Sequence, residues 1–333
     1  MDIDAFVAAH RLEWDRLEVL SRRPGRLNGT EVDELVDLYQ RTATHLSTVR
    51  SAAPDPALVA RLSTLVARGR SAVAGTSSPA WRELARFVLM GFPAAVYRAR
   101  WWWIGAALGS IVVGVALGWW VAVNPAVQAS IAAPDQIRQL VDNDFQSYYS
   151  SHAASAFALQ VWTNNAWLSA LVIISGGLLG LPVPYLLFQN AANVGVSAGL
   201  MAANGKLGLF FGLILPHGLL ELTAVFVAAG VGLRLGWTIV APGERPRAEA
   251  VAVEGRAAVG VAMGLVVVLL VSGVIEAFVT PSGLPTWARI GIGTAAWAGF
   301  LAYVWVLGGR AARAGETGDL DRSAAGDTAP ISP

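Results

Sequence analysis

The feature that most constrains this chain is an uncharged apolar segment long enough to span a membrane. Residues 101–123 read WWWIGAALGSIVVGVALGWWVAV, without a charged side chain and with tryptophans at both ends. About 20 apolar residues cross the hydrocarbon core of a bilayer as a helix, and tryptophan favours the two interfaces. Further apolar segments occur at about 166–181, 184–203, 207–240, 257–279 and 287–308. The sequence therefore predicts an all-α, polytopic transmembrane helix bundle of about six spans.

The overall composition is also that of a membrane protein. Hydrophobic residues make up 55% of the chain and charged residues 14%, and the mean hydropathy is +0.52. The formal net charge of +1 gives no electrostatic support to nucleic-acid binding. The absence of cysteine excludes disulfides, thiolate metal sites and a cysteine nucleophile. Because no phosphate-binding loop, HExxH or GxSxG motif occurs either, a non-enzymatic protein without a cofactor is the favoured interpretation.

The N-terminal part of the chain has a different character. Residues 1–78 alternate polar and apolar positions at helical spacing, which predicts a soluble helical domain, with Thr30 and Asp55 as helix N-caps. No early apolar signal segment precedes them, so we expect this domain in the cytoplasm. Residues 79–99 mix arginines with large apolar side chains, as is typical of an amphipathic helix on the cytoplasmic membrane surface.

The placement of arginine predicts the orientation of the spans. Arg98 and Arg100 precede the first span and anchor it at the cytoplasmic face. Arg234 ends the long apolar run and is either another anchor at this face or the partner of an internal carboxylate. The predicted division is a transmembrane bundle over 100–310, with 124–162 outside the membrane, and a disordered tail over 311–333. Both termini are then cytoplasmic, and the lipid bilayer is the first expected partner.

Pairs of glycines spaced four residues apart recur in the apolar segments. Such spacing lets helix backbones approach closely, so it favours a compact bundle and leaves a homo-oligomer open. The pairs are Gly105/Gly109, Gly114/Gly118, Gly195/Gly199, Gly208/Gly212 and Gly260/Gly264.

The run 207–240 contains the sequence LPHGLLE and is too long for one simple crossing. As one helix, its 34 residues would extend over about 50 Å. Pro216 lacks a backbone donor and Gly218 is a poor helix former, so we expect a break at Pro216–Gly218. The residues before it would form a half-helix or a re-entrant hairpin. Irregular backbone at membrane depth survives where protein or a polar cavity covers it.

His217 and Glu221 lie four residues apart within this run. In one interpretation Glu221 pairs with backbone amides and His217 packs against a neighbour. In the other, the two side chains form a proton relay, a ligand site or a metal site, since ionisable groups at this depth are usually functional. Two ligands on one helix do not make a metal site without a third, so no metal is predicted beyond these two candidate ligands.

Other polar side chains could complete an intramembrane site. They are Asn164 and Asn165 before the second span, Gln189, Asn190 and Asn193 in the third, and Glu276 near the outer end of the fifth. Hydrogen bonding between helices is the alternative role for the amides, and contact with interfacial water for Glu276. Arg289 is a possible partner of Glu276 across the connecting loop. The other histidines, His10, His45 and His152, show no pattern typical of a site.

These residues also carry a family resemblance. The segments NNAW (164–167), FQNAANVGVSAG (188–199), LPHGLLELTAVFVAAGVGLRLG (215–236) and IEAFVTPSGLP (275–285) resemble the stage II sporulation protein M family. The resemblance implies a bacterial plasma-membrane protein, and the namesake of the family is a scaffold for peptidoglycan-degrading partners during engulfment. Longer relatives, which share the extra N-terminal helical domain, imply a MoxR-type AAA+ ATPase as a partner. This domain is absent from the short sporulation form, which weighs against a sporulation role.

Three functional hypotheses follow. The first is a scaffold that organises membrane or cell-envelope proteins through its basic cytoplasmic face and its helical domain. The second is a transporter or channel-like protein whose polar site contains His217 and Glu221. The third is an intramembrane hydrolase that uses the same two residues. A scaffold should tolerate Glu221→Gln, whereas the other two should lose activity.

Overall fold

The structure is a computed structural model that describes residues 3–23, 27–52, 55–73, 80–144 and 154–320. All secondary-structure elements in these ranges are helices, as the sequence predicts. Contacts divide the chain into two compact units, Met1–Glu83 and Leu84–Pro333. Each unit has a hydrophobic core of its own.

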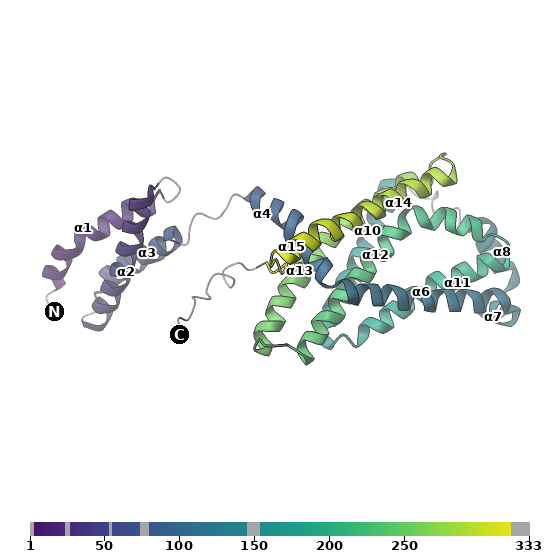
Figure 1. Ribbon diagram of the computed structural model, residues 1–333, viewed down its shortest axis with the longest axis horizontal. Helices are drawn as coiled ribbons and strands as arrows, with labels where there is room; N and C mark the ends of the chain where they lie inside the picture. The colour runs from purple at the N-terminus through teal and green to yellow at the C-terminus, as the bar shows by residue number, and fades with distance from the viewer. Residues whose placement is uncertain (1–2, 24–26, 53–54, 74–79, 145–153, 321–333) are drawn as a thin grey trace. The chain divides into compact units, whose positions relative to one another are not determined.

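The described residues of the first unit include the helices α1 (Ile3–Ser21), α2 (Gly29–Ala52) and α3 (Pro56–Val73), drawn in purple in Figure 1. Their apolar faces meet in a core that includes the fully buried Trp14, Leu17, Leu35, Val49 and Leu62. Apolar residues at helical spacing on all three helices therefore account for the packing of this unit.

The starts of α2 and α3 show which capping predictions are correct. The backbone N–H of Glu31 donates to Asn28 Oδ1, and the Asn28 N–H donates to Glu31 Oε2, each at 2.9 Å. This reciprocal pair makes Asn28 the N-cap of α2, so the prediction of Thr30 is wrong by two residues. At α3 the prediction is confirmed, because Asp55 Oδ1 accepts from the Ala57 N–H at 2.9 Å.

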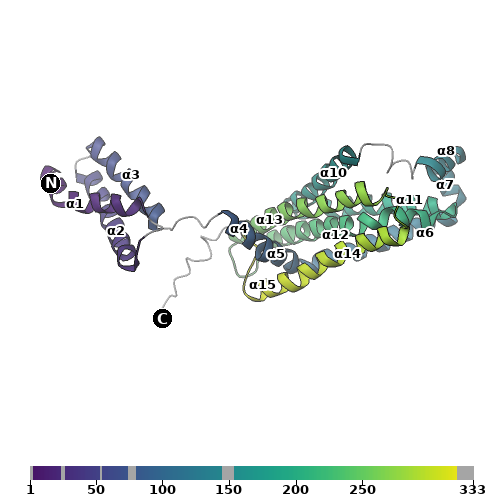
Figure 2. The same ribbon diagram turned by 90° about the horizontal axis from the view of Figure 1, so that it is seen from above.

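The second unit is a bundle of long helices joined by short elements. The long helices are α6 (Arg100–Val123), α10 (Ala154–Ile174), α11 (Pro182–Ala203), α12 (Leu207–Val240), α13 (Arg247–Val274) and α14 (Thr286–Tyr303). The short elements are α4 (Ala80–Arg86), η2 (Phe87–Gly91), α5 (Phe92–Arg98), α7 (Pro125–Ile131), α8 (Pro134–Gln139), η3 (Leu140–Asp144), η4 (Ser175–Leu178), η5 (Ile275–Val279), η6 (Val304–Gly308) and α15 (Gly309–Arg313). The long helices run side by side, with α7 and α8 at one end and α5 and α15 at the other (Figure 2).

Four helical segments in the described part of the chain are long and apolar enough to cross a membrane. They are Arg100–Val123, Leu207–Val240, Arg247–Val279 and Thr286–Arg313. The segments predicted at 166–181 and 184–203 correspond to α10 and α11, which have 21 and 22 residues but are interrupted by amides and small polar side chains. The chain is therefore a helical membrane protein with at least four candidate spans.

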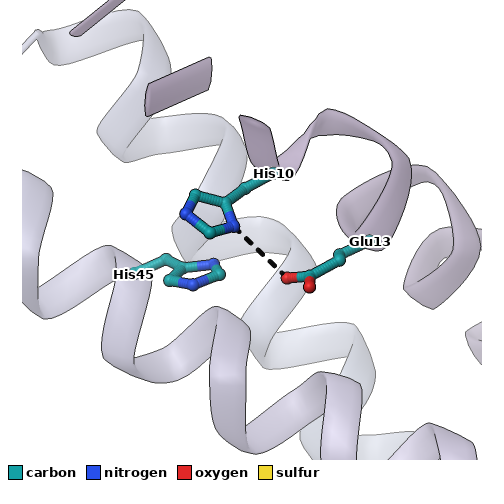
Figure 3. Close-up of side chains that lie close together, drawn as sticks. All are labelled: His10, Glu13 and His45. Atoms are coloured by element: carbon teal, nitrogen blue, oxygen red, sulfur yellow. Dashed lines mark ion pairs between the residues drawn. The ribbon is translucent and has the colours of Figure 1, made fainter. Parts of the chain in front are cut away.

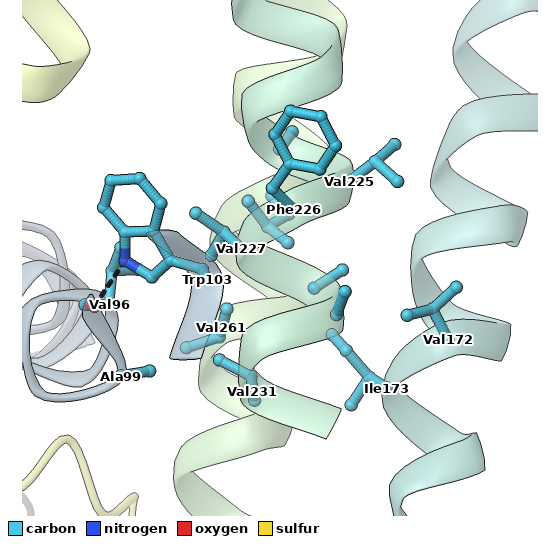
Figure 4. Packing of buried hydrophobic residues seen from close by; sticks show 14 of the residues in the cluster. Val96, Ala99, Trp103, Val172, Ile173, Val225, Phe226, Val227, Val231 and Val261 are labelled. Atoms are coloured by element: carbon cyan, nitrogen blue, oxygen red, sulfur yellow. Dashed lines mark hydrogen bonds between the residues drawn. The ribbon is translucent and has the colours of Figure 1, made fainter. Parts of the chain in front are cut away.

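The bundle core forms where α5, α6, α10, α12 and α13 meet (Figure 4). Trp103 of α6 lies against the α12 backbone, since a Cβ added at Gly230 would lie 2.4 Å from the backbone nitrogen of Trp103. The indole N–H of Trp103 donates to the Val96 carbonyl at 3.2 Å, which satisfies the polar end of this buried ring. Trp103 thus belongs to the protein interior, whereas Trp101 and Trp119 on the same helix are exposed.

Two of the glycine pairs explain how closely α6 and α11 pack. Cβ atoms added at Gly118 and Gly195 would lie 2.9 Å and 2.4 Å from the carbonyl oxygens of Gly195 and Gly114, respectively. The backbones are therefore in direct contact, as small-residue spacing predicts. The pair Gly105/Gly109 has no neighbouring atom within 4 Å of the added Cβ atoms and makes no such contact.

The helix predicted to lie on the membrane surface at 79–99 is partly built into the bundle. Its second half, α5, buries Phe92, Ala94, Ala95 and Val96. Packing against α13 and η6 removes this apolar face from water more completely than contact with the membrane surface would. Burial in the bundle is therefore the more favourable in free energy.

Acidic residues near the C-terminus are held by arginines of the bundle. The contacts are Arg86 Nη2 to Glu316 Oε2 at 2.5 Å, Arg98 Nη1 to the Thr317 carbonyl at 2.8 Å, and Arg256 Nε and Nη2 to the Asp319 carboxylate at 2.5 and 2.7 Å. The prediction of a disordered tail over 311–333 is therefore wrong for residues 311–320, and 321–333 lie outside the described residues. Charge-assisted hydrogen bonds order this segment. Their partners are far apart in the sequence, so the sequence alone does not predict these bonds.

Arg234 lies at the same end of the bundle. Its Nε atom is 2.9 Å from Glu254 Oε1, and both side chains are largely buried, at 16% and 14% exposure. Pairing with a largely buried carboxylate, one of the two interpretations of Arg234, is thus observed. Arg98 lies within electrostatic range of both residues, and we call the end that carries Arg98, Arg234 and Arg256 the arginine end.

The predicted break at Pro216–Gly218 does not occur. α12 is one continuous helix of 34 residues from Leu207 to Val240, with Pro216 inside it. The proline removes one donor, the one that would bond the carbonyl of Gly212. α14 packs directly on this turn, because a Cβ added at Gly293 would lie 1.9 Å from the Pro216 carbonyl oxygen. A neighbouring helix therefore supports the backbone where local propensity predicts a break.

Candidate functional site

A buried cluster of three ionisable side chains lies where α12 meets η5. His217 and Glu221 are one turn apart on α12, and Glu276 enters from η5, a π-helical turn that continues α13. One ligand atom from each of the three lies within 4.8 Å of the others. The wider π-turn shifts the residues of η5 relative to the α-helix before it, and such turns are frequent at functional sites. We call His217, Glu221 and Glu276 the His–Glu–Glu cluster.

His217 is fixed on both sides of its ring. Its Nε2 atom is 3.8 Å from Glu276 Oε1, and its Nδ1 atom is 3.3 Å from Thr280 Oγ1. Ser272 Oγ donates to the His217 carbonyl at 3.0 Å, which adds a link from α13. The side chain of His217 is therefore held between α12 and the end of the fifth predicted span.

Burial distinguishes the members of the cluster. His217 and Glu276 have only 5% and 4% of their surface exposed, whereas Glu221 is partly exposed. Glu276 Oε2 is buried and accepts no hydrogen bond from the described residues. The interpretation of Glu276 as an interfacial carboxylate in water is therefore wrong. An ionised carboxylate buried in this way is costly unless a proton, a cation or several donors compensate it.

The amide partner of the cluster comes from α10. Asn165 forms a side-chain hydrogen bond with Glu221, whereas its neighbour Asn164 is exposed. The candidate amides of α11 lie elsewhere: Gln189 and Asn193 are exposed, and Asn190 lines a groove. In the described part of the chain, no hydrogen bond joins these three to the cluster.

That groove is apolar and has a volume of about 450 Å³. It runs between α6, α11 and α12, and Gly114, Gly118 and Phe226 are among its lining residues. No member of the His–Glu–Glu cluster lines this groove. Because His217 and Glu276 are buried between α12 and η5, the cluster is part of a helix contact.

Arg289 does not pair with Glu276, the partner considered from the sequence. Its Nη1 atom donates to the Thr280 carbonyl at 2.6 Å, and its Nη2 atom donates to Thr286 Oγ1 at 3.1 Å. Arg289 thus closes the turn between η5 and α14 and acts on the cluster only through Thr280.

A second cluster, which the sequence did not indicate, lies in the N-terminal unit (Figure 3). His10 and His45 come from α1 and α2, and their ring centroids are 4.0 Å apart. His10 Nδ1 is 3.5 Å from Glu13 Oε2, and the Trp14 indole N–H donates to His45 Nδ1 at 3.2 Å. Because Nδ1 of His45 accepts this hydrogen bond, the proton of the neutral ring lies on Nε2. The only sequence signal was the spacing of His10, Glu13 and Trp14 on one face of α1.

The surroundings of His45 disfavour its charged form. Burial lowers its pKa from the ordinary value of 6.5, and the nearby His10 and Arg41 lower the pKa further, whereas Glu13 raises it. A neutral His45 ring packed against the His10 ring is a stable helix contact at neutral pH, and acid weakens this contact.

The comparisons with known proteins bear on the bundle first. A family model described as Stage II sporulation protein M matches residues 107–281, which is more than half of the chain. The chain belongs to the stage II sporulation protein M family. All three members of the His–Glu–Glu cluster lie within the residues that this family model covers.

The remaining comparisons add one match. A model for a domain of unknown function (DUF8413) matches residues 4–75, which correspond to the first unit. Searches among curated proteins and among solved structures found no match to this stage II sporulation protein M family member. The family assignment therefore rests on the family model and on the segments that resemble it.

Proposed function

We propose that this family member is a six-span protein of the bacterial plasma membrane that acts as a scaffold for membrane or cell-envelope proteins. In this proposal α10 and α11 cross the bilayer together with the four more apolar segments. An even number of crossings brings the start of α6 and the end of α15 to the same side. Their common location at the arginine end supports this path, because Arg98 bonds the Thr317 carbonyl.

The arginine end also supports the orientation. Arginine is enriched on the cytoplasmic side of bacterial membrane proteins, so both termini are assigned to the cytoplasm. Arg245, between α12 and α13, and Arg247, the first residue of α13, are exposed at this end. They are available to a partner, whereas the arginines that hold residues 316–319 are already engaged.

The orientation is testable because the chain has no cysteine. Single cysteines placed at Arg138 in α8 and at Gly243 between α12 and α13 should react with a membrane-impermeant maleimide from opposite sides of the membrane. Labelling from the same side would contradict the six-span proposal.

The observation that carries the scaffold proposal is the presence of a separate helical unit with its own core. Residues 4–75 match a domain model that is distinct from the family model of the bundle. A compact cytoplasmic unit joined to a packed membrane bundle is suited to holding partners. The MoxR-type AAA+ ATPase implied by the family resemblance is the partner class that we propose.

The scaffold proposal predicts partners that depend on specific surfaces. Cross-linking and capture from native membranes should enrich such an ATPase with the full chain. The yield should fall when Arg245 and Arg247 are changed to glutamine or when residues 1–78 are removed. Arg138→Gln, at the opposite end, is the matched control and should keep the partner. Equal recovery with all these chains would contradict the proposal.

The His–Glu–Glu cluster supports one second candidate, a transporter or channel-like protein. Ionisable groups at membrane depth often mark an ion path. Glu221→Gln should then abolish ion flux in proteoliposomes while partner capture persists. A scaffold predicts a different result. The wild type should show no ion flux, and Glu221→Gln should still fold and capture the partner.

A further inference from the structure

We infer that the His–Glu–Glu cluster binds one divalent transition-metal ion of the Zn²⁺ class, which ties α12 to η5 inside the bundle. His217 Nε2 and one carboxylate oxygen each from Glu221 and Glu276 are the protein ligands. The sequence offered only two ligands on one helix, and the structure brings the third from a different element.

The spacing of the three ligand atoms fits such an ion. Zinc bonds nitrogen and oxygen at about 2.0–2.1 Å, so ligand atoms in a tetrahedral site are about 3.3 Å apart. The His217 Nε2 to Glu276 Oε1 distance is 3.8 Å, and all three atoms lie within 4.8 Å of one another. The first distance is too long for a good hydrogen bond, whereas small rotations of the glutamate side chains bring the set to metal-binding geometry.

The contact between His217 and Thr280 is compatible with the ring tautomer that a metal requires. Thr280 Oγ1 lies 3.3 Å from Nδ1 and can accept a hydrogen bond from Nδ1–H. In that tautomer the Nε2 lone pair is free to bind a metal, and Nε2 is the ring nitrogen that faces Glu276. Ligating histidines are usually oriented by such a bond from their second nitrogen.

Glu276 supplies an independent indication of a ligand. Its Oε2 atom is buried without a hydrogen-bond partner among the described residues, in a side chain that is 6% exposed. Buried carboxylate oxygens are normally satisfied, because burial without a partner costs several kcal/mol. A cation beside both oxygens satisfies this atom, and Asn165 orients the other carboxylate through its bond to Glu221.

Charge and ligand type identify the class of ion. Two carboxylates with a neutral imidazole carry a charge of about −2, which one divalent cation cancels in a medium of low dielectric constant. Ca²⁺ and Mg²⁺ prefer six or more oxygen ligands, whereas an imidazole with two carboxylates suits zinc and its neighbours. A water molecule or a further oxygen would complete four-coordination.

The decisive experiment measures zinc in the full chain, purified without a polyhistidine tag in lipid nanodiscs. After dialysis against metal-free buffer, we expect about one zinc ion per chain by mass spectrometry, since a closed site of this type retains its ion. Glu276→Gln keeps the shape of the side chain but removes its charge, and it should lose at least nine-tenths of the zinc. Added Zn²⁺ should raise the thermal midpoint of the wild type and leave that of the variant unchanged.

The N-terminal cluster provides the matched control. His45→Gln disrupts the contact between His45 and His10 and should retain the zinc, whereas His217→Gln should lose it. Zinc that is lost from His45→Gln but kept by His217→Gln would overturn the inference.

Substitution with Co²⁺ gives a readout that requires no variant. A tetrahedral site with one imidazole and two carboxylates produces strong visible bands, and their absence from the refolded or metal-exchanged wild type would overturn the inference. A wild type that contains no zinc would also overturn it, and would assign the cluster to carboxyl groups that share protons.

Discussion

The contact between Gly293 of α14 and Pro216 of α12 gives a sharp test of the packing of the bundle. A Cβ added at Gly293 would lie 1.9 Å from the Pro216 carbonyl oxygen. Carbon and oxygen atoms of this kind approach to about 3.3 Å, so Gly293→Ala must separate α14 from α12 by about 1.4 Å. Overpacking of a core costs about 1–3 kcal/mol, and we expect the upper end because backbone, not a flexible side chain, is the obstacle. The helix propensity of alanine returns about 1 kcal/mol, which leaves a net loss of about 2 kcal/mol.

The assay is thermal unfolding in nanodiscs at one fixed heating rate, because membrane proteins often unfold irreversibly. A loss of about 2 kcal/mol corresponds to a midpoint lower by about 4–8 °C for a domain of this size. Gly291→Ala in the same helix is the control, since a Cβ added at Gly291 would meet no atom within 4 Å. It should be neutral or slightly stabilising. If Gly293→Ala is as stable as this control, the close approach of α14 to Pro216 is refuted.

Three further predictions concern other parts of the chain. Pro216→Ala should leave the bundle folded and raise its stability slightly, because alanine restores a donor to a continuous helix; loss of the folded state in size-exclusion chromatography would instead support a break. Asp319→Asn should weaken the paired hydrogen bonds from Arg256 by about 1–2 kcal/mol. Hydrogen exchange of residues 316–320 should then be about ten-fold faster, and unchanged exchange would show that this segment is held by other contacts. Because burial lowers the pKa of His45 below 6.5, the unfolded chain binds more protons just below pH 6.5 than the folded chain does. The N-terminal unit should therefore keep its full stability above about pH 6.5 and lose stability as the pH falls below it; because His45 is partly exposed, the loss should stay well under the limit of about 1.4 kcal/mol per pH unit. Hydrogen exchange of this unit, corrected for the intrinsic rate, measures the loss, and His45→Gln should abolish it.

The sequence was most informative where a property depends on neighbours along the chain. The uncharged run that ends in tryptophans predicted α6, and the small-residue pairs Gly114/Gly118 and Gly195/Gly199 predicted a close contact between α6 and α11. Segment length and hydropathy are local quantities, so they can be read from the sequence without knowledge of the fold.

Properties that depend on tertiary neighbours were predicted poorly. Pro216 indicated a break because helix propensity depends on the residue alone and takes no account of the contact with Gly293 of α14. Of the amides that the sequence offered as site residues, Asn165 of α10 bonds Glu221, whereas no hydrogen bond among the described residues joins those of α11 to the cluster. Glu276 was recognised as a candidate, but its burial depends on the π-turn that contains it.

The contact between Arg86 and Glu316 spans 230 residues of sequence. During synthesis, the ribosome has therefore released every membrane helix before this acidic segment can reach its arginine. The guanidinium groups of α4, α5 and α13 must meanwhile be neutralised by lipid phosphates or by counterions. A reporter protein fused directly after Arg313 would replace Glu316 and Asp319, so the arginines would stay bound to lipid phosphates or counterions. Fusions that begin beyond Leu320 keep these acidic residues and are the better tools for studying this protein.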